Sequence, residues 1–342
     1  MPAFLAGRAL VGAGAGASLL AASMYASEMY DNQVTVANTL NAAWAVGALS
    51  IATVASLCGD WRVIAAAGVS PALVIFALTA RMEESVHWLL ESERGAAKAR
   101  LSLRRLAAVR NVTRPPELSH ITQDVADAAR ASLVDGSGAS NHPPIVCQAN
   151  ATARSLSATS ITTILAIVSL TTGAMYFGLS LGIGKLSGSI HANAIFGALA
   201  ELPAYVCAPV VLCVLGRRAS AICGLVACSA AMVLCTSSLP AVVYTANFAG
   251  KFAVCTMYSS IYTLAAEALA PRARGTAFAA MRVTDAIGSV CATLTAALPN
   301  PFIVLAATSA ATAAVACRLP ETRAPEQRRE PIKKQVGMAV GM

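Results

Sequence analysis

Nine long apolar stretches divide this chain, and they constrain its fold more than any motif does. A helix that crosses the hydrocarbon core of a bilayer needs about 20 mostly apolar residues. The nine stretches approach or exceed this length, and they lie at roughly 3–25, 34–57, 62–80, 157–181, 190–215, 219–239, 241–265, 276–298 and 301–317. The sequence therefore predicts an all-α membrane protein with about nine transmembrane helices, whose main surroundings are the lipid bilayer.

The composition supports this prediction and excludes several other classes of protein. Of the 342 residues, 56% are hydrophobic and only 12% are charged, whereas soluble domains carry about 25% charged residues. A chain of this size has too little polar surface to fold as a soluble enzyme. It is also too apolar to be disordered in water.

The positions of Lys and Arg predict the orientation of the chain. If the segment 81–156 is cytosolic and the spans alternate, cytosolic segments hold 20 of the 25 Lys and Arg residues and outer segments hold two. Positive charge gathers on the cytoplasmic side of membrane proteins. The C-terminal tail is then cytosolic, and the net charge of +8 needs no nucleic-acid partner to explain it. Met1 would lie outside, and we expect that N-terminal spans are missing from this chain.

The spans and loops suggest four regions. Residues 1–80 hold three spans, which we interpret as the remnant of an N-terminal transmembrane half. Residues 81–156 form a cytosolic loop, in which 95–110 resemble a basic helix at the membrane surface. Residues 157–319 hold the six spans of a C-terminal half, and 320–342 form a polar cytosolic tail.

No motif indicates catalysis or a bound cofactor. The ten cysteines show no paired CxxC spacing, so neither a metal site nor a disulfide framework is predicted. Nucleotide-binding and hydrolase motifs are not visible, and no residue pattern specifies a coupling ion. We therefore expect a protein that is not an enzyme and that has no cofactor.

Several short segments, taken together in order, resemble a known family. They include Gly-Arg-Ala-Leu-Val-Gly, Asp-Trp-Arg, Glu-Ser-Val-His-Trp-Leu-Leu, Glu-Leu-Pro-Ala-Tyr, Leu-Gly-Arg-Arg, Gly-Lys-Phe and Leu-Pro-Glu-Thr, which begin at 7, 60, 84, 201, 215, 250 and 319. Two others are Tyr-Phe-Gly-Leu-Ser-Leu at 176 and the run from Ala266 to Ala277. This ordered set is similar to the organic cation/carnitine/anion transporter branch of the major facilitator superfamily.

The resemblance implies a fold and a function. Such transporters have two six-helix halves that rock about a site near the middle of the membrane, and this chain would lack the first three helices. It implies transport of small organic cations or zwitterions, carnitine-like or quaternary ammonium compounds, by alternating access at the plasma membrane. Two alternatives are an organic anion transporter of the same family and a truncated fragment or regulatory isoform that does not transport.

Charged residues inside the spans are the candidates for substrate binding, because such charges are costly in lipid. Glu201 lies near the middle of a span, where a carboxylate can attract an organic cation. Asp285 lies one residue before the position of an acid in cation-selective relatives, which rotates it by about 100° on a helix. Asp285 therefore either faces a cavity or pairs locally with Arg282.

Lys251 and three aromatic residues complete the predicted substrate site. Lys251 is expected to pair with Glu201 or Asp285, or else to meet an anionic substrate. Tyr176, Phe252 and Tyr262 can supply aromatic walls for a cation, although packing between helices is the commoner use of such residues.

Charges at the cytosolic ends of the spans are candidates for gating. The resemblance implies that such residues pair when the cytosolic side closes, and that breaking the pairs opens it. The candidates are Arg217, Arg218, Glu267 and Arg274 in the C-terminal half and Glu28 and Glu84 in the N-terminal half. The alternative for the arginines is that they only fix the topology.

Overall fold

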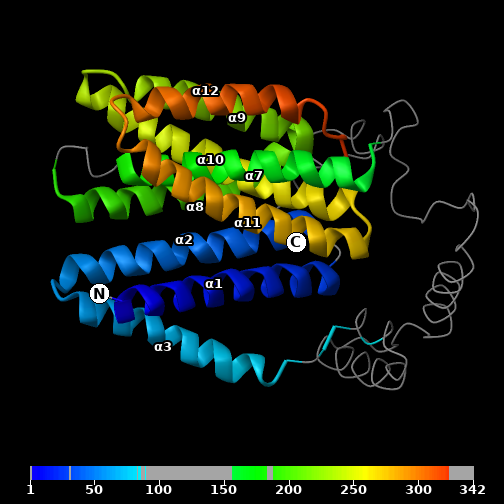
Figure 1. The fold of residues 1–342 in the computed structure, drawn as a ribbon, viewed down its shortest axis with the longest axis horizontal. Helices are drawn as coiled ribbons and strands as arrows, with labels where there is room; N and C mark the ends of the chain where they lie inside the picture. Colours follow the sequence, from blue (N-terminus) through cyan, green and yellow to red (C-terminus); the bar gives the residue numbers. More distant parts are fainter. Residues whose placement is uncertain are drawn as a thin grey trace, which may run out of the picture. The chain divides into compact units, whose positions relative to one another are not determined.

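The computed structural model describes residues 2–30, 32–82, 84, 85, 89, 156–182 and 188–322, and these residues contain nine α-helices and no strand (Figure 1). The helices are α1 (Pro2–Met29), α2 (Gln33–Leu57), α3 (Trp61–Thr79), α7 (Ala158–Gly182), α8 (Ile190–Leu215), α9 (Arg217–Leu234), α10 (Pro240–Ala268), α11 (Pro271–Thr295) and α12 (Pro301–Ala316). The prediction of an all-α fold is confirmed for this part of the chain. The predicted basic helix at 95–110 lies outside the described residues.

The helices follow the nine apolar stretches, and the differences have local causes. The predicted stretch 276–298 is shifted in the structure, because α11 begins at Pro271 and ends at Thr295. Proline at the first position of a helix has its φ already set and loses no hydrogen bond there. For the same reason α9 ends at Leu234, short of the predicted 239, and Pro240 opens α10. Hydropathy alone does not predict these helix boundaries.

Seven of the described helices are long and apolar enough to cross a membrane. The other two are α12, which has only 16 residues, and α10, which is long but more polar. Much of α10 is buried within the protein, including Lys251 and a run of Ser, Thr and Tyr residues near its end. Its polar side chains therefore face protein rather than lipid, which explains the low hydropathy of a helix at the centre of the bundle.

The described residues belong to two compact units. The first comprises residues 1–27, 32–70 and 147–342, and the second comprises 28–31 and 71–146. One boundary falls at Pro71 inside α3, where proline removes a backbone hydrogen bond. The candidate site described below lies in the first unit.

Within the first unit, α7 packs closely along α11, α10 along α9, and α2 along α8. Two glycines allow the closest of these contacts. A Cβ at Gly288 would lie 2.0 Å from the carbonyl oxygen of Leu170, and one at Gly173 would lie 2.4 Å from that of Asp285. Small residues let helices approach closely in membranes. The contact fixes the position of the α11 segment that carries Arg282 and Asp285 against α7.

Candidate functional site

Lys251 of α10 and Glu201 of α8 form an ion pair in the interior of the first unit. The Nζ atom of Lys251 lies 2.9 Å from Oε1 of Glu201, and the side chains are only 3% and 2% exposed. The pairing that the sequence suggested between these residues is therefore present. Removing two charges from water is costly, and such pairs persist where further hydrogen bonds satisfy them.

Tyr176 and Ser180 of α7 supply those further interactions. The hydroxyl of Tyr176 donates to Oε1 of Glu201 at 2.9 Å, and Lys251 donates to Oγ of Ser180 at 2.7 Å. The ammonium group also lies 3.6 Å from the centre of the Tyr176 ring, a cation–π contact. Two helices, α7 and α8, thus surround the ammonium group of Lys251 with a carboxylate, a hydroxyl and an aromatic face.

Trp44 links this cluster to α2. Its indole Nε1–H donates to the hydroxyl of Tyr176 at 3.0 Å, which extends the network from α2 through α7 to α8. Sequence analysis did not single out Trp44 or Ser180. A lone tryptophan and a serine in apolar stretches give no signal until the helices are assembled.

Asp285 and Arg282 of α11 lie on the same face of the bundle but do not form an ion pair of 4.0 Å or less with each other. Asp285 accepts a hydrogen bond from the hydroxyl of Tyr258 at 2.6 Å. Arg282 lies over the ring of Tyr262, with 4.5 Å between its Cζ atom and the ring centre. Each of the two residues thus contacts a tyrosine of α10, and Arg282 also acts electrostatically on the Asp285 carboxyl.

Three positions of α10 thus meet three charged groups. Lys251, Tyr258 and Tyr262 are separated by seven and four residues, a spacing that places them on one face of a helix. Phe252 is one position from Lys251 and points elsewhere, being 36% exposed. The structure therefore brings together all the predicted substrate-binding residues except Phe252 along this face of α10 and its neighbours.

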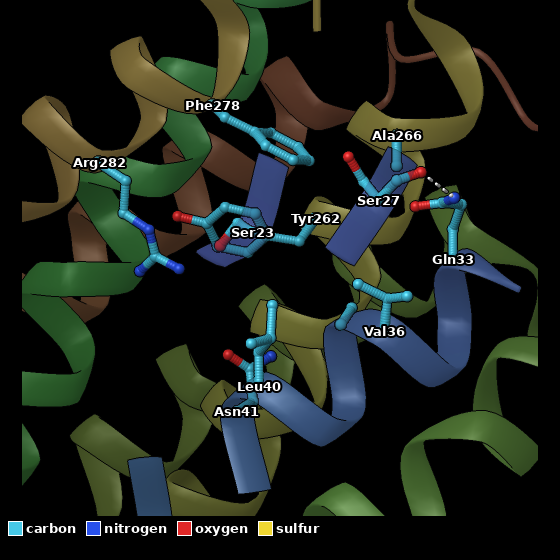
Figure 2. A pocket seen from close by; sticks show the side chains of 11 residues that line it. Ser23, Ser27, Gln33, Val36, Leu40, Asn41, Tyr262, Ala266, Phe278 and Arg282 are labelled. Atoms are coloured by element: carbon cyan, nitrogen blue, oxygen red, sulfur yellow. Dashed lines mark hydrogen bonds between the residues drawn. The ribbon is translucent and has the colours of Figure 1, made fainter. Parts of the chain in front are cut away.

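A pocket opens beside Tyr262, between α1, α2, α10 and α11. The space inside it that the centre of a water-sized sphere can reach is only about 20 Å³, room for about one water molecule. Figure 2 shows its side chains reaching in from these four helices. Serines 23 and 27, Gln33, Asn41, Tyr262 and Arg282 form the polar part of the lining, and Val36, Ala37, Leu40, Ala266 and Phe278 the apolar part.

Charged residues also gather where α9 begins and α10 ends. Nη2 of Arg217 lies 2.8 Å from Oε1 of Glu267, and Oε2 of Glu267 accepts from the hydroxyl of Thr322 at 2.5 Å. The carboxylate of Glu321 accepts from the backbone N–H groups of Arg217 and Arg218 at 2.9 and 3.2 Å. A carboxylate at the first N–H groups of a helix is favourable.

The start of α9 thus brings together part of the predicted gating set. Glu267 pairs with Arg217, and Arg274 lies near the start of α11. Gly216, with φ +88°, precedes α9, and a Cβ there would lie 2.7 Å from Glu321. Sequence analysis missed the role of Glu321, because its contact is with backbone atoms more than 100 residues earlier in the chain.

The two N-terminal gating candidates lie in the second unit. The carboxylate of Glu28 accepts a short hydrogen bond from the hydroxyl of Ser85. Glu84 is exposed. Among the residues that the structure describes, no group of three or more His, Cys, Asp or Glu side chains is arranged to hold a metal ion.

A bundle of apolar helices with charged side chains paired in its interior defines a helical membrane protein with a polar internal site. The family described as "Sugar (and other) transporter" matches residues 1–317, and this chain belongs to that family. The resemblance that the sequence motifs indicated is thereby confirmed.

Individual relatives give a more specific comparison than the family does. The chain is 25% identical over 324 residues to the human (Homo sapiens) "Organic cation/carnitine transporter 2", covering 92% of this chain and 56% of the relative. It is 25% identical over 326 residues to an "Organic cation transporter protein" of Drosophila melanogaster, covering 92% of this chain and 58% of that protein. The chain therefore spans a little over half the length of these relatives.

Proposed function

We propose that this chain carries small organic cations or zwitterions, of the carnitine or quaternary ammonium kind, across a membrane by alternating access. The observation that carries this proposal is the cluster around Lys251. There a carboxylate, a hydroxyl and an aromatic face already surround one ammonium group. The names of the relatives, an organic cation/carnitine transporter and an organic cation transporter protein, support the same substrate class.

In this proposal Glu201 and Asp285 attract the cationic part of the substrate, and Tyr176 and Tyr262 present aromatic faces to it. Lys251 occupies the carboxylate of Glu201 while no substrate is bound. An arriving cation competes with the ammonium group of Lys251 for Glu201, so binding and rearrangement of this pair are coupled. Phe252 then contributes to the site only if α10 rotates.

The charged cluster at the ends of α9 and α10 serves as the cytosolic gate. Arg217, Arg218 and Glu267 hold that end together with Glu321, and breaking these contacts accompanies opening. Arg274 joins them in the C-terminal half. Glu28 and Glu84 perform the corresponding role in the N-terminal half. The regions 1–80, 81–156, 157–319 and 320–342 act as partial N-terminal half, cytosolic loop, C-terminal half and cytosolic tail of a plasma-membrane protein.

A second candidate substrate class is organic anions. It is favoured by the two cations in the bundle, Lys251 and Arg282. A third possibility is that this chain regulates a partner without transporting.

Uptake of labelled tetraethylammonium into cells that display the chain at their surface tests the proposal. We expect uptake above that of untransfected cells and a large loss in Glu201→Gln, with the surface amounts matched. Uptake of a labelled organic anion but of no cation would favour the organic anion transporter over the proposed cation transporter. Uptake of neither, by a chain shown to be folded at the surface, would leave the regulatory role.

A further inference from the structure

The ion pair between Glu201 and Lys251 joins two side chains that have almost no access to solvent. Their Oε1 and Nζ atoms lie 2.9 Å apart, and the side chains are 2% and 3% exposed. A carboxylate that is enclosed between membrane helices without a cation is costly. The ammonium group of Lys251 therefore neutralises Glu201 from within the protein.

The ammonium group of Lys251 also has two contacts that do not involve Glu201, both with residues of α7. It donates a hydrogen bond to Oγ of Ser180 at 2.7 Å, and it lies 3.6 Å from the centre of the Tyr176 ring. The aromatic face attracts a cation without carrying a charge. If Lys251 releases Glu201, its ammonium group thus keeps an acceptor and an aromatic contact, so the carboxylate can change partners at a reduced cost.

Lys251 is also the group that sets the charge around Glu201. Tyr176 donates its hydroxyl proton to Oε1 at 2.9 Å, and Tyr205 and Cys255 are the other titratable side chains on which Glu201 acts electrostatically. Helix α2, which packs along α8, contributes no charged residue. Of these surrounding groups only Lys251 carries a positive charge.

We propose that Lys251 is a built-in counter-cation, which replaces the transported cation on Glu201 while the unloaded protein returns between its two conformations. This inference rests on the proposed function and adds to it how the return step occurs. An alternating-access carrier closes around its site twice in each cycle, once with substrate and once without it. With Lys251 on Glu201, both closures enclose a neutralised carboxylate, and no co-transported cation has to supply the second charge.

This role predicts net transport rather than obligatory exchange. Net uptake requires the unloaded carrier to return, whereas exchange of substrate for substrate requires only the loaded form. Without the ammonium group, Glu201 is left uncompensated when the substrate leaves, so return should be slow and exchange should persist. Because Lys251 competes with the substrate for Glu201, its removal should also lower the substrate concentration that gives half-maximal exchange.

Fluxes of radiolabelled tetraethylammonium through the purified full chain in liposomes test this role. Net uptake is measured into liposomes that contain no tetraethylammonium, and exchange into liposomes that are preloaded with it. Both are measured without Na⁺ and at equal pH inside and outside, with equal K⁺ and valinomycin to hold the membrane potential at zero. We expect the wild type to show both net uptake and exchange under these conditions.

Variants assign the net uptake to the ammonium group. Because an uncompensated buried charge raises the barrier to return, Lys251→Met should lower net uptake by about tenfold or more and leave exchange within about threefold. Lys251→Arg keeps the charge and should retain part of the net uptake. Arg62→Met is the matched control for the loss of one cation, because Arg62 is exposed and lies over the ring of Trp61 at 4.8 Å. Both of its fluxes should equal those of the wild type.

The outcomes separate this inference from the proposed function. Wild-type exchange without net uptake, or net uptake only after Na⁺ or a pH difference is supplied, would overturn the counter-cation and leave transport standing. These wild-type measurements decide the question even if Lys251→Met does not fold. Equal losses of both fluxes in folded Lys251→Met, or loss of neither, would overturn it as well. Neither flux in folded wild type would overturn the proposed function and this inference with it.

Discussion

Only one oxygen of the Glu201 carboxylate, Oε1, takes part in the ion pair with Lys251. Oε1 accepts both from Lys251 and from Tyr176 at 2.9 Å, while Oε2 is buried without a hydrogen-bond partner among the described residues. One oxygen thus holds three helices together, and the other is available to a further donor. In the proposed mechanism, Oε2 is the atom that a further donor would engage while Lys251 still holds Oε1.

The pair should be stabilising only while both partners are present. Removing one charge of a buried pair leaves the other uncompensated, which costs about 3–5 kcal/mol, whereas replacing both by apolar groups is often neutral. We expect Lys251→Met and Glu201→Leu each to lower the thermal unfolding temperature of the purified protein, and the double variant to recover most of the loss. Additive losses in the double variant would show that the two charges do not depend on each other.

The hydrogen bond between Trp44 and Tyr176 should be measurable as a coupling energy. Trp44→Phe keeps an aromatic ring and removes the Nε1–H group, and Tyr176→Phe removes its acceptor. A neutral hydrogen bond contributes about 1 kcal/mol, so a double-mutant cycle should give a coupling of about this size. Trp61→Phe serves as the control, because Trp61 is 59% exposed. No coupling between Trp44 and Tyr176 would mean that α2 is not tied to the cluster through this bond.

The contact between α7 and α11 should not tolerate the addition of a methyl group at Gly288. Gly288→Ala would place its Cβ 2.0 Å from a backbone oxygen, and overpacking of this kind costs about 1–3 kcal/mol. Gly12→Ala is the same substitution at a site with nothing within 4 Å, and alanine favours a helix by up to about 1 kcal/mol. Thermal unfolding followed with a thiol-reactive dye should therefore show a loss for Gly288→Ala and none for Gly12→Ala.

The sequence predicted the helices well and the site only in part. Hydropathy depends on neighbouring residues in the chain, whereas the contacts of the site join residues that are far apart in it. The stretch predicted at 190–215 is also the extent of α8, because hydropathy is a local property of about 20 residues. Glu201 and Lys251 could be chosen because charges are rare in such stretches. Their pairing was one of the two ion pairs predicted for Lys251, beside contact with an anionic substrate, and only the packing of α8 against α10 distinguishes it from a pair with Asp285.

Uncharged partners could not be found in this way. Trp44, Ser180 and Tyr258 belong to residue types that are common in helices, and nothing in their sequence neighbourhood sets them apart. Arg282 was visible as a charge, but its contact with Tyr262 depends on how α11 is rotated against α10. The glycine contact between α7 and α11 sets that rotation, and it joins residues more than 100 positions apart in the chain.

The cluster at the end of α9 leads to a last prediction, about charge reversal. Arg217 and Glu267 lie 2.8 Å apart and are largely shielded from solvent, with side chains 10% and 22% exposed. Arg217→Glu or Glu267→Arg alone places like charges together, so each should lower both stability and any measured uptake. The double variant restores opposite charges and should recover part of both, although Thr322 then meets an arginine where it met a carboxylate. Arg318→Glu, at an exposed position just after α12 that is not assigned to the gate, provides the control for a change of net charge at this end. Recovery in the double variant, beyond what Arg318→Glu loses, would assign the effect to the pair; no recovery would indicate that Arg217 acts through topology alone.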